Sequence, residues 1–325
     1  MIITRTPLRM SFVGGGSDIE SYYRENGGAV LSTTIDRYVY INLHSSFGKN
    51  VRIAYSKVED VDNFSLVEHP LVREVARHFR VDTGLEMTSI ADIPAKGTGL
   101  GSSSSFTVGL IHAFCAHLGL NLGKVEIAKL ACKIEIEACM QPIGKQDQYA
   151  AATGGFNIFK FNPDGNVTIS RIQLGDYERH KLQSWMMVFY TGGTRSASKI
   201  LAEQTENASK KNHRNSLDEM VKLVEPFSDA LIKANISEAG LMLDTNWRLK
   251  RTLASGVSSN EIDEIYEAAS INGAVGGKLL GAGAGGFMLF LVPPERHNDV
   301  SHALRHLKQV FWNFDILGSS VIMQT

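Results

Sequence analysis

The sequence predicts an α+β fold in two domains. The chain has 325 residues, which is enough for two ordinary domains or one large one. Segments with the apolar spacing of strands and of helices both recur along the whole chain. The pattern weakens around residues 165–184, so we place the boundary there, with residues 1–180 as an N-terminal domain and 181–325 as a C-terminal domain.

In the N-terminal domain the glycine-rich turns separate short strands from amphipathic helices. We expect strands at 2–6, 8–13, 29–35, 38–43, 51–55, 86–92 and 156–161, and helices at 19–24, 68–79, 103–118 and 124–139. Ser17 or Asp18 is the expected cap of the first helix. Asp164-Gly165 is expected to turn a hairpin, and residues 175–178 are expected to form a loop.

The C-terminal domain is expected to be richer in helix. We expect strands at 185–190, 287–292 and 319–323, and helices at 196–212, 216–234, 236–249, 260–272 and 295–311.

Composition indicates a soluble globular protein without a strong charge. Hydrophobic residues make up 43% of the chain and charged residues 21%, with a formal net charge of −1. No long run of one charge sign occurs, so we expect neither nucleic acid nor a membrane as a partner. No apolar run reaches the ~18 residues of a membrane span, no signal-peptide pattern opens the chain, and three sparse cysteines suit reduced thiols. We therefore expect a cytoplasmic protein.

The stretch from Pro94 to Phe106 carries the clearest functional signal. Three glycines within five residues are followed by four serines and then by the apolar spacing of a helix. A glycine turn that leads into a serine-capped helix directs several free N–H groups at one point, which suits a phosphate. The alternative is a flexible loop with an ordinary cap. The stretch is not a Walker loop, because Lys96 precedes the glycines.

Two other polar segments have a structural and a functional interpretation. Arg9 and Asp18 flank three consecutive glycines, as in a strand–turn–helix corner or in a polar substrate pocket. Asp147 lies close to Lys145 in a stretch flanked by apolar sequence, and a buried carboxylate requires partners. Asp147 is therefore either one half of a structural ion pair or a reacting group.

Two further patterns do not support other functions. Gly281, Gly283 and Gly286 satisfy the dinucleotide signature, but a helix is expected before them and a strand after them, the reverse of a nicotinamide-binding unit. His302 and His306 have the i, i+4 spacing of a metal pair, but the sequence offers no third ligand nearby. We interpret this pair as part of a solvated helix face.

Together the glycine segments resemble the GHMP family of small-molecule kinases. Pro7–Asp18 is similar to its first motif, Pro94–Ser104 to its ATP-phosphate motif and Leu279–Phe287 to its C-terminal glycine motif. The resemblance implies a two-domain kinase fold. An N-terminal α/β domain would carry the ATP loop, a C-terminal helix-rich, ferredoxin-like α+β domain would complete it, and the active site would lie between them. It also implies ATP and Mg²⁺ as cofactors.

The family's functional residues fall on specific positions of this chain. Asp147 matches the catalytic Asp, Arg9 the basic residue of the first motif, and Ser103 and Glu135 the Mg²⁺ ligands, with Glu137 as the fallback. The ATP loop falls on Lys96, Gly97, Thr98, Gly99, Leu100, Gly101, Ser102, Ser103 and Ser104. The expected substrate-binding residues are Arg9, Gly14, Gly15, Gly16, Asp18, Lys145, Asp147, Gly192, Arg195 and Gly283.

Within the family, the first motif and the segment Gly144–Ala152 are most similar to bacterial kinases of D-glycero-D-manno-heptose 7-phosphate, with fucokinases as the nearest rival. Galactokinases carry Glu-His where this chain has Gly15-Gly16, which argues against galactose. The resemblance implies ATP-dependent phosphorylation of the anomeric hydroxyl, giving the 1,7-bisphosphate for GDP-heptose synthesis and surface polysaccharide. A sugar phosphate and ATP are the expected small-molecule partners, and a homodimer is left open.

The phosphate of such a sugar needs a basic residue, and the sequence offers Arg195 and Lys199, with Lys145 and Lys96 as further candidates. A kinase-like sensor without activity is the non-enzyme alternative. Such a sensor would have no need of Glu135 and Asp147, and both are present.

Overall fold

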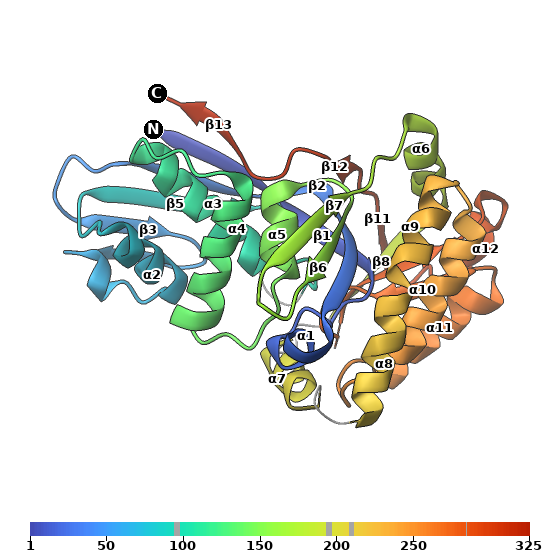
Figure 1. Cartoon of the computed structure of the whole chain (residues 1–325). Helices are drawn as coiled ribbons and strands as arrows, with labels where there is room; N and C mark the ends of the chain where they lie inside the picture. Colours follow the sequence, from blue (N-terminus) through green and yellow to red (C-terminus); the bar gives the residue numbers. More distant parts are fainter. Residues whose placement is uncertain (94–97, 193–196, 208–210, 284) are drawn as a thin grey trace.

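The computed structural model describes residues 1–93, 98–192, 197–207, 211–283 and 285–325. Its first layer is a large mixed sheet in the N-terminal half (Figure 1). The sheet runs in the order β13-β1-β2-β5-β3-β4, with the β6–β7 hairpin added to β2. Its strands from this half are β1 (Ile2–Val13), β2 (Gly28–Ser45), β3 (Val51–Ala54), β4 (Val58–Val61), β5 (Leu85–Ala91), β6 (Asn157–Phe161) and β7 (Val167–Arg171), and the end of the chain adds β12 (Phe314–Asp315) and β13 (Ser320–Gln324).

The two long strands β1 and β2 are each continuous, where the sequence predicts two shorter strands. Pro7 pairs with Tyr38 and Leu8 pairs with Ile35, so the two residues between the predicted strands, Asp36 and Arg37, form a bulge in β2. A β-bulge absorbs extra residues without ending the strand. The continuous β1 carries Arg9 on its way to the glycine turn at residues 14–16.

Helices cover one face of this sheet. The central helix α3 (Ser102–His117) packs on β1 and β2, and α4 and α5 pack beside it. The surrounding elements are α1 (Glu20–Asn26), η1 (Phe64–Leu66), α2 (Pro70–Phe79), α4 (Lys124–Cys132) and α5 (Gln146–Thr153). After Cys132 the helix continues as the π-helical turn η2 (Lys133–Ala138), which contains Glu135. Such π-helical turns occur frequently at functional sites.

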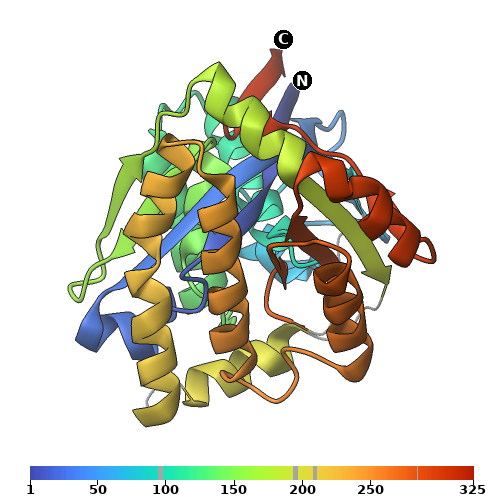
Figure 2. The ribbon, with the colours of Figure 1, turned by 90° about the vertical axis from the view of Figure 1, so that its right-hand side faces the viewer.

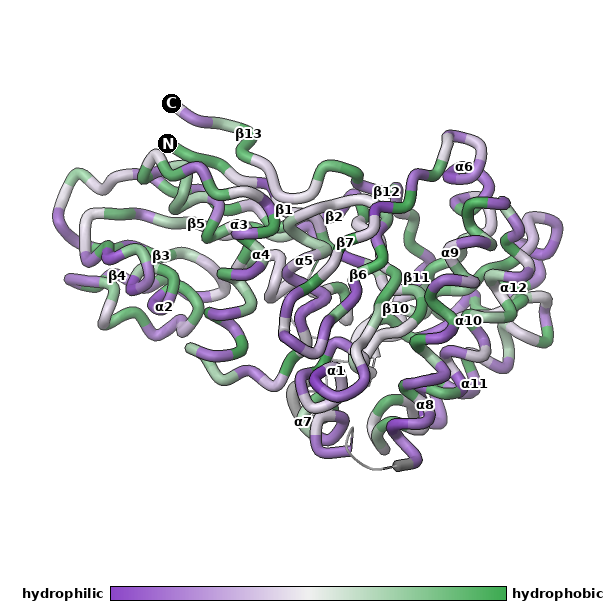
Figure 3. The backbone as a smooth tube through the Cα atoms, viewed as in Figure 1, coloured by the Kyte–Doolittle hydropathy of each residue, from purple (hydrophilic) through white to green (hydrophobic). Residues whose placement is uncertain are grey.

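The C-terminal half combines a smaller antiparallel sheet with a stack of helices, which stand side by side in Figure 2. The sheet has the order β11-β8-β10-β9. The tube is mostly apolar along β10 and mostly polar along α8 (Figure 3), as expected for a buried strand and a surface helix. The elements are α6 (Asp176–Trp185), β8 (Met186–Gly192), α7 (Ala197–Asn207), α8 (Lys211–Lys222), α9 (Val224–Ile232), α10 (Ile236–Arg251), α11 (Asn260–Ile271), β9 (Gly276–Leu279), β10 (Gly286–Leu291), η3 (Pro294–Arg296), α12 (His297–Ala303) and β11 (Lys308–Val310).

Three predicted elements in this half were wrong in extent or type. The loop expected at 175–178 opens helix α6, whose single fully buried residue Leu182 gives too weak a periodicity to reveal it. The helix expected at 216–234 divides into α8 and α9, because Pro226 lacks an N–H and its ring would clash with the carbonyl of residue 222. The helix expected at 295–311 ends at Ala303, and β11 follows it.

The end of the chain returns to the first sheet. β12 (Phe314–Asp315) pairs with β2, and β13 (Ser320–Gln324) pairs with β1. The amino group of Met1 donates to the Thr325 hydroxyl at 2.9 Å, so the two termini lie side by side (Figure 1). The boundary at 180/181 stays a prediction. Among the described residues, no helix is long and apolar enough to cross a membrane.

Candidate active site

The glycine loop before α3 is packed against the C-terminal glycine segment. Gly99 has φ +72°, and a Cβ on it would lie 2.2 Å from the Leu280 carbonyl oxygen. A Cβ on Gly281 would lie 2.3 Å from the Gly99 Cα. Only glycines allow this approach. Two motifs that are separated by most of the chain therefore meet at one point, and the Arg9 N–H fixes the loop by donating to the Leu100 carbonyl at 3.0 Å.

The first turn of α3 differs from the serine cap that the sequence predicts. The N-cap residue is Gly101, with φ +71°, and it has no side chain to offer the first-turn amides. The N-terminal amides of a helix lack acceptors within the helix, so this turn suits an anionic ligand. Ser103 and Ser104 instead direct their hydroxyls at Glu135. The cap predicted for the first helix, Ser17 or Asp18, was also wrong, because Ile19 is the N-cap of α1.

Arg9 and Asp147 form a two-pronged ion pair at this loop. Arg9 Nε donates to Asp147 Oδ1 at 2.6 Å, and Arg9 Nη2 donates to Oδ2 at 2.7 Å. The remaining Arg9 Nη1 donates to the Gly99 carbonyl at 2.6 Å. A Cβ on Gly101 would lie 3.1 Å from Asp147 Oδ2. The carboxylate is thus held within contact distance of the loop backbone by a charge-assisted fork.

Glu135 lies next to the serines of α3 in a buried, oxygen-rich cluster. Its Oε1 accepts from the Ser103 hydroxyl at 3.1 Å, and its Oε2 accepts from Ser104 at 2.8 Å and from Gln148 Nε2 at 2.5 Å. Burial raises the pKa of Glu135 to about 7, although these hydrogen bonds act to lower it. The oxygen of the Gln148 amide is buried without a hydrogen-bond partner. The cluster therefore has unused capacity for a ligand.

A cavity joins Asp147 and Arg9 to the glycine turn of the first motif. Asp18 lies in its wall, where it accepts from the main-chain N–H of Gly16 and of Gln146, each at 3.1 Å. Burial, and then the nearby Asp147, raise the pKa of Asp18. The cavity is lined by Arg9, Gly16, Asp18, Ile19, Ile143, Gly144, Gln146, Asp147, Leu201, Gln204, Lys250, Gly281 and Ala282. Carboxylates, amides and cations in one small cleft suit a polyhydroxylated acceptor.

Sequence reasoning missed Lys250, which lines this cavity from α10. Lys250 is buried and donates from Nζ to the Gly281 carbonyl at 2.6 Å. Burial, and then Arg9, lower its pKa to about 8. The signal was present, because Lys250 follows the buried Leu243 and Trp247 at i+7 and i+3 on the inner face of the helix.

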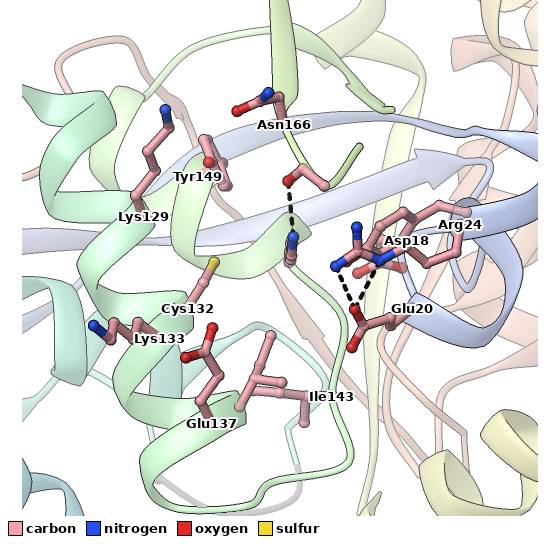
Figure 4. Close-up of a pocket in the computed structure, with 14 residues that line it drawn as sticks. Asp18, Glu20, Arg24, Lys129, Cys132, Lys133, Glu137, Ile143, Tyr149 and Asn166 are labelled. Atoms are coloured by element: carbon pink, nitrogen blue, oxygen red, sulfur yellow. Dashed lines mark hydrogen bonds and ion pairs between the residues drawn. The ribbon is translucent and has the colours of Figure 1, made fainter. Parts of the chain in front are cut away.

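Lys145 points into a second, adjoining cavity rather than towards Asp147. Its Nζ donates to the Gly165 carbonyl at 2.9 Å and lies 4.8 Å from the centre of the Tyr23 ring. Figure 4 shows Lys129, Lys133 and Glu137 along one wall of this cavity and the Arg24–Glu20 ion pair on the other. The two cavities share Asp18 and Ile143 in their walls.

The other predicted site residues divide into three groups. Gly14 is required by packing, because a Cβ on it would lie 2.0 Å from the Ala29 carbonyl oxygen. Gly283 packs against Val257, and Gly192 has open space around it. Lys96, Gly97 and Arg195 lie outside the described residues, as does the side chain of Lys199.

The dinucleotide-like glycines and the histidine pair, which we did not interpret as a nicotinamide-binding or a metal site, lie in ordinary secondary structure or on the surface. Gly281 follows β9 and Gly286 begins β10, so a strand precedes these glycines where we expected a helix. The strand β10 follows them, whereas a dinucleotide-binding unit requires a helix at this point. His302 and His306 are exposed, and no cluster of three metal-ligating side chains occurs in the described ranges.

Comparison with known proteins identifies the family. Residues 66–155 match the N-terminal domain of GHMP kinases, and residues 227–311 match their C-terminal domain. The D-glycero-alpha-D-manno-heptose 7-phosphate kinase of Campylobacter jejuni is 33% identical over 94% of this chain and 93% of its own. The chain belongs to the GHMP kinase family.

Other relatives show how far the likeness extends within the family. Mevalonate kinase of Pyrococcus horikoshii is 29% identical over 93% of this chain and 83% of its own. A crystal structure described as a D-glycero-D-manno-heptose 1-phosphate kinase from Bacteroides thetaiotaomicron superposes with a TM-score of 0.83 at 26% identity, covering 100% of both chains. This GHMP kinase therefore has the predicted two-domain fold of mixed helix and sheet. It is a phosphotransferase with an alcohol acceptor and ATP as the phosphate donor.

Proposed function

We propose that this GHMP kinase transfers the γ-phosphate of ATP to the anomeric hydroxyl of D-glycero-D-manno-heptose 7-phosphate, in a cytoplasmic route to nucleotide-activated heptose for surface polysaccharide. One observation carries the proposal: the Arg9–Asp147 pair lies against the glycine loop and in the same cavity as Asp18. The choice of sugar rests on the C. jejuni relative. A fucokinase-like or other sugar 1-kinase is the alternative.

Phosphoryl transfer depends on positioning and charge neutralisation more than on covalent chemistry. The main-chain amides of residues 98–104 would hold the β- and γ-phosphates at the start of α3. Asp147 would accept the proton of the acceptor hydroxyl or only orient that hydroxyl, and the two roles are the alternatives that the family leaves open. Arg9 already bridges Asp147 and the Gly99 carbonyl, so its guanidinium is in place to offset the charge that develops on the transferred group.

The residues present fit a bound Mg²⁺. Mg²⁺ takes oxygen ligands and is often held by one or two carboxylates together with substrate phosphates and waters. Glu135 and the Ser103 hydroxyl would supply the protein oxygens, and the unpartnered Gln148 oxygen lies in the same cluster. A bound Mg²⁺ would neutralise charge on the β- and γ-phosphate oxygens. Ser103 and Glu135 remain our proposed ligands.

ADP release with ATP, Mg²⁺ and a panel of sugars tests this function. The panel pairs heptose 7-phosphate with free heptose and adds fucose and galactose, with mevalonate as a non-sugar acceptor. We expect heptose 7-phosphate to give the highest kcat/KM, and NMR of the product to show a new phosphate on C1. A higher value for fucose would favour the alternative, and ATP binding without turnover of any acceptor would favour a sensor.

A further inference from the structure

The acceptor cavity contains a buried cation that none of the matched motifs includes. Lys250 lies on α10, and only 4% of its surface is exposed. Its ammonium donates to the Gly281 carbonyl, a neutral acceptor, and it lines the cavity of Asp18 and Asp147. Keeping an ammonium out of water costs several kcal/mol, on the order of what a well-placed counter-charge returns. Asp18 and Asp147 contribute negative charge from the same cavity, but within the described ranges the ammonium itself has only the Gly281 carbonyl as a direct partner and can accept an anionic one.

In the part of the chain that the structure describes, no carboxylate forms an ion pair with Lys250. Asp147 is held by both prongs of Arg9, and Asp18 is held by two main-chain amides. The buried Lys278 differs, because its Nζ donates to the carbonyls of Ser11 and Phe12 at 2.9 and 3.0 Å and does not line the cavity. Of the two lysines that are buried among the described residues, Lys250 is thus the one that lines the cavity.

Gly15 leaves the space in front of Lys250 open. A Cβ on Gly15 would lie 3.7 Å from Lys250 Nζ and 3.9 Å from Gln146 Nε2. Gln146 Nε2 is in turn 3.4 Å from Asp18 Oδ1, which places Lys250 on the acceptor side of the cavity. A longer side chain at position 15 would fill this space. An acceptor group placed here meets an ammonium and an amide donor.

We propose that Lys250 binds a phosphate group that the acceptor sugar already carries, so that this residue sets a preference for phosphorylated over free sugars. The inference rests on the proposed function and deepens it. A phosphate offers acceptor oxygens to both the ammonium and the Gln146 amide. The adjoining cavity of Lys129 and Lys133 is the rival position, but both of these lysines are exposed to solvent, which weakens their hold on a phosphate.

The first test compares Lys250→Met with Lys133→Met. Methionine keeps the length and apolar stem of Lys250 but removes its charge. We expect kcat/KM for heptose 7-phosphate to fall about 10- to 100-fold, mainly through KM, which is the range for one hydrogen bond to a charged group. The loss on free heptose should be smaller, so that the ratio of kcat/KM for heptose 7-phosphate to that for free heptose falls at least about 10-fold. Equal losses on both sugars, or the selective loss in Lys133→Met, would overturn the assignment.

The second test places a counter-charge beside Lys250 without removing it. Gly15 does not have a positive φ, so other residues fit its backbone. Gly15→Glu should pair with Lys250 and reverse the preference towards free heptose, whereas Gly15→Ala should keep the wild-type ratio between the two sugars. An unchanged ratio in Gly15→Glu, with the folded state verified by circular dichroism, would contradict the proposal.

Calorimetry without ATP separates this inference from the proposed function. Wild-type protein should bind heptose 7-phosphate more tightly than free heptose, and Lys250→Met should lose that difference. If Lys250-dependent binding is found but no sugar is turned over, the kinase proposal fails and the assignment of Lys250 stands. If the wild type turns over only free sugars and binds both forms equally, the assignment of Lys250 fails and the kinase activity stands.

Discussion

Replacing Asp147 with asparagine tests the proposed chemistry most sharply, because the change is nearly isosteric. The asparagine side chain would keep one oxygen as an acceptor for Arg9. Its NH2 group would face the second donor, Arg9 Nη2, which in the wild type lies 2.7 Å from Oδ2 of Asp147. A general base contributes typically about 10²–10⁴-fold in rate, or about 3–5 kcal/mol of transition-state stabilisation. We therefore expect kcat to fall by at least about 100-fold.

ATP affinity should remain close to that of the wild type, since the phosphates would be held by the main chain of residues 98–104. The Arg9 side chain is only 6% exposed, so the broken fork should also cost about 1–3 kcal/mol of stability. Coupled ADP release measures kcat, calorimetry with a non-hydrolysable ATP analogue measures affinity, and urea unfolding measures stability. Near-wild-type turnover would remove Asp147 from the chemistry, and a matching loss of ATP binding would show a structural role instead.

Three further predictions concern the loop, the metal cluster and the acceptor cavity. Gly101→Ala should lose most activity, because the new Cβ would lie 3.1 Å from Oδ2 of Asp147. The control Gly119→Ala has a similar φ of +68° and open space around it, so it should lose only about 1–2 kcal/mol of stability through backbone strain. Equal activities in the two variants would contradict this prediction. Glu135→Gln should raise the Mg²⁺ concentration that gives half of the maximal rate by about 10- to 100-fold. The control Glu137→Gln, on the exposed side of the same turn, should leave this concentration unchanged. The reverse result would identify Glu137 as the metal ligand. Burial lowers the pKa of Lys250 to about 8, so its ammonium loses its charge as the pH rises through that value. The kcat/KM for a phosphorylated sugar should therefore fall as the pH rises through about 8. A fall of the same size in Lys250→Met would show that another group causes the pH dependence.

The sequence predicted the parts of the site that depend on local pattern. Glycines in a strand–turn–helix context mark the loop around Gly99 and Gly101, and a polar segment after Pro142 marks Asp147. The kinase fold was expected from the family resemblance and was confirmed by the matches to both GHMP domains. Spacing marks the loop as a candidate phosphate site, whereas the role expected for Asp147 came from the family resemblance, because the local pattern left it open between a structural ion pair and a reacting group.

The contacts that complete the site join residues far apart in the chain. Arg9 and Asp147 are separated by 138 positions, and no local pattern shows that they pair rather than Lys145 and Asp147. Ser103 and Ser104 follow a glycine as a cap would, but the buried Glu135 provides a stronger partner than the helix amides. Lys250 was overlooked because a lysine in a helix is usually a surface residue, although its spacing from Trp247 places it on the inner face.

A crystal structure with a non-hydrolysable ATP analogue, Mg²⁺ and heptose 7-phosphate tests the central claim most directly. The account predicts the triphosphate against the main-chain amides of residues 98–104, and the acceptor hydroxyl within hydrogen-bond reach of Asp147 and in line with the γ-phosphate. A triphosphate bound away from this loop, or an acceptor bound out of reach of Asp147, would contradict it.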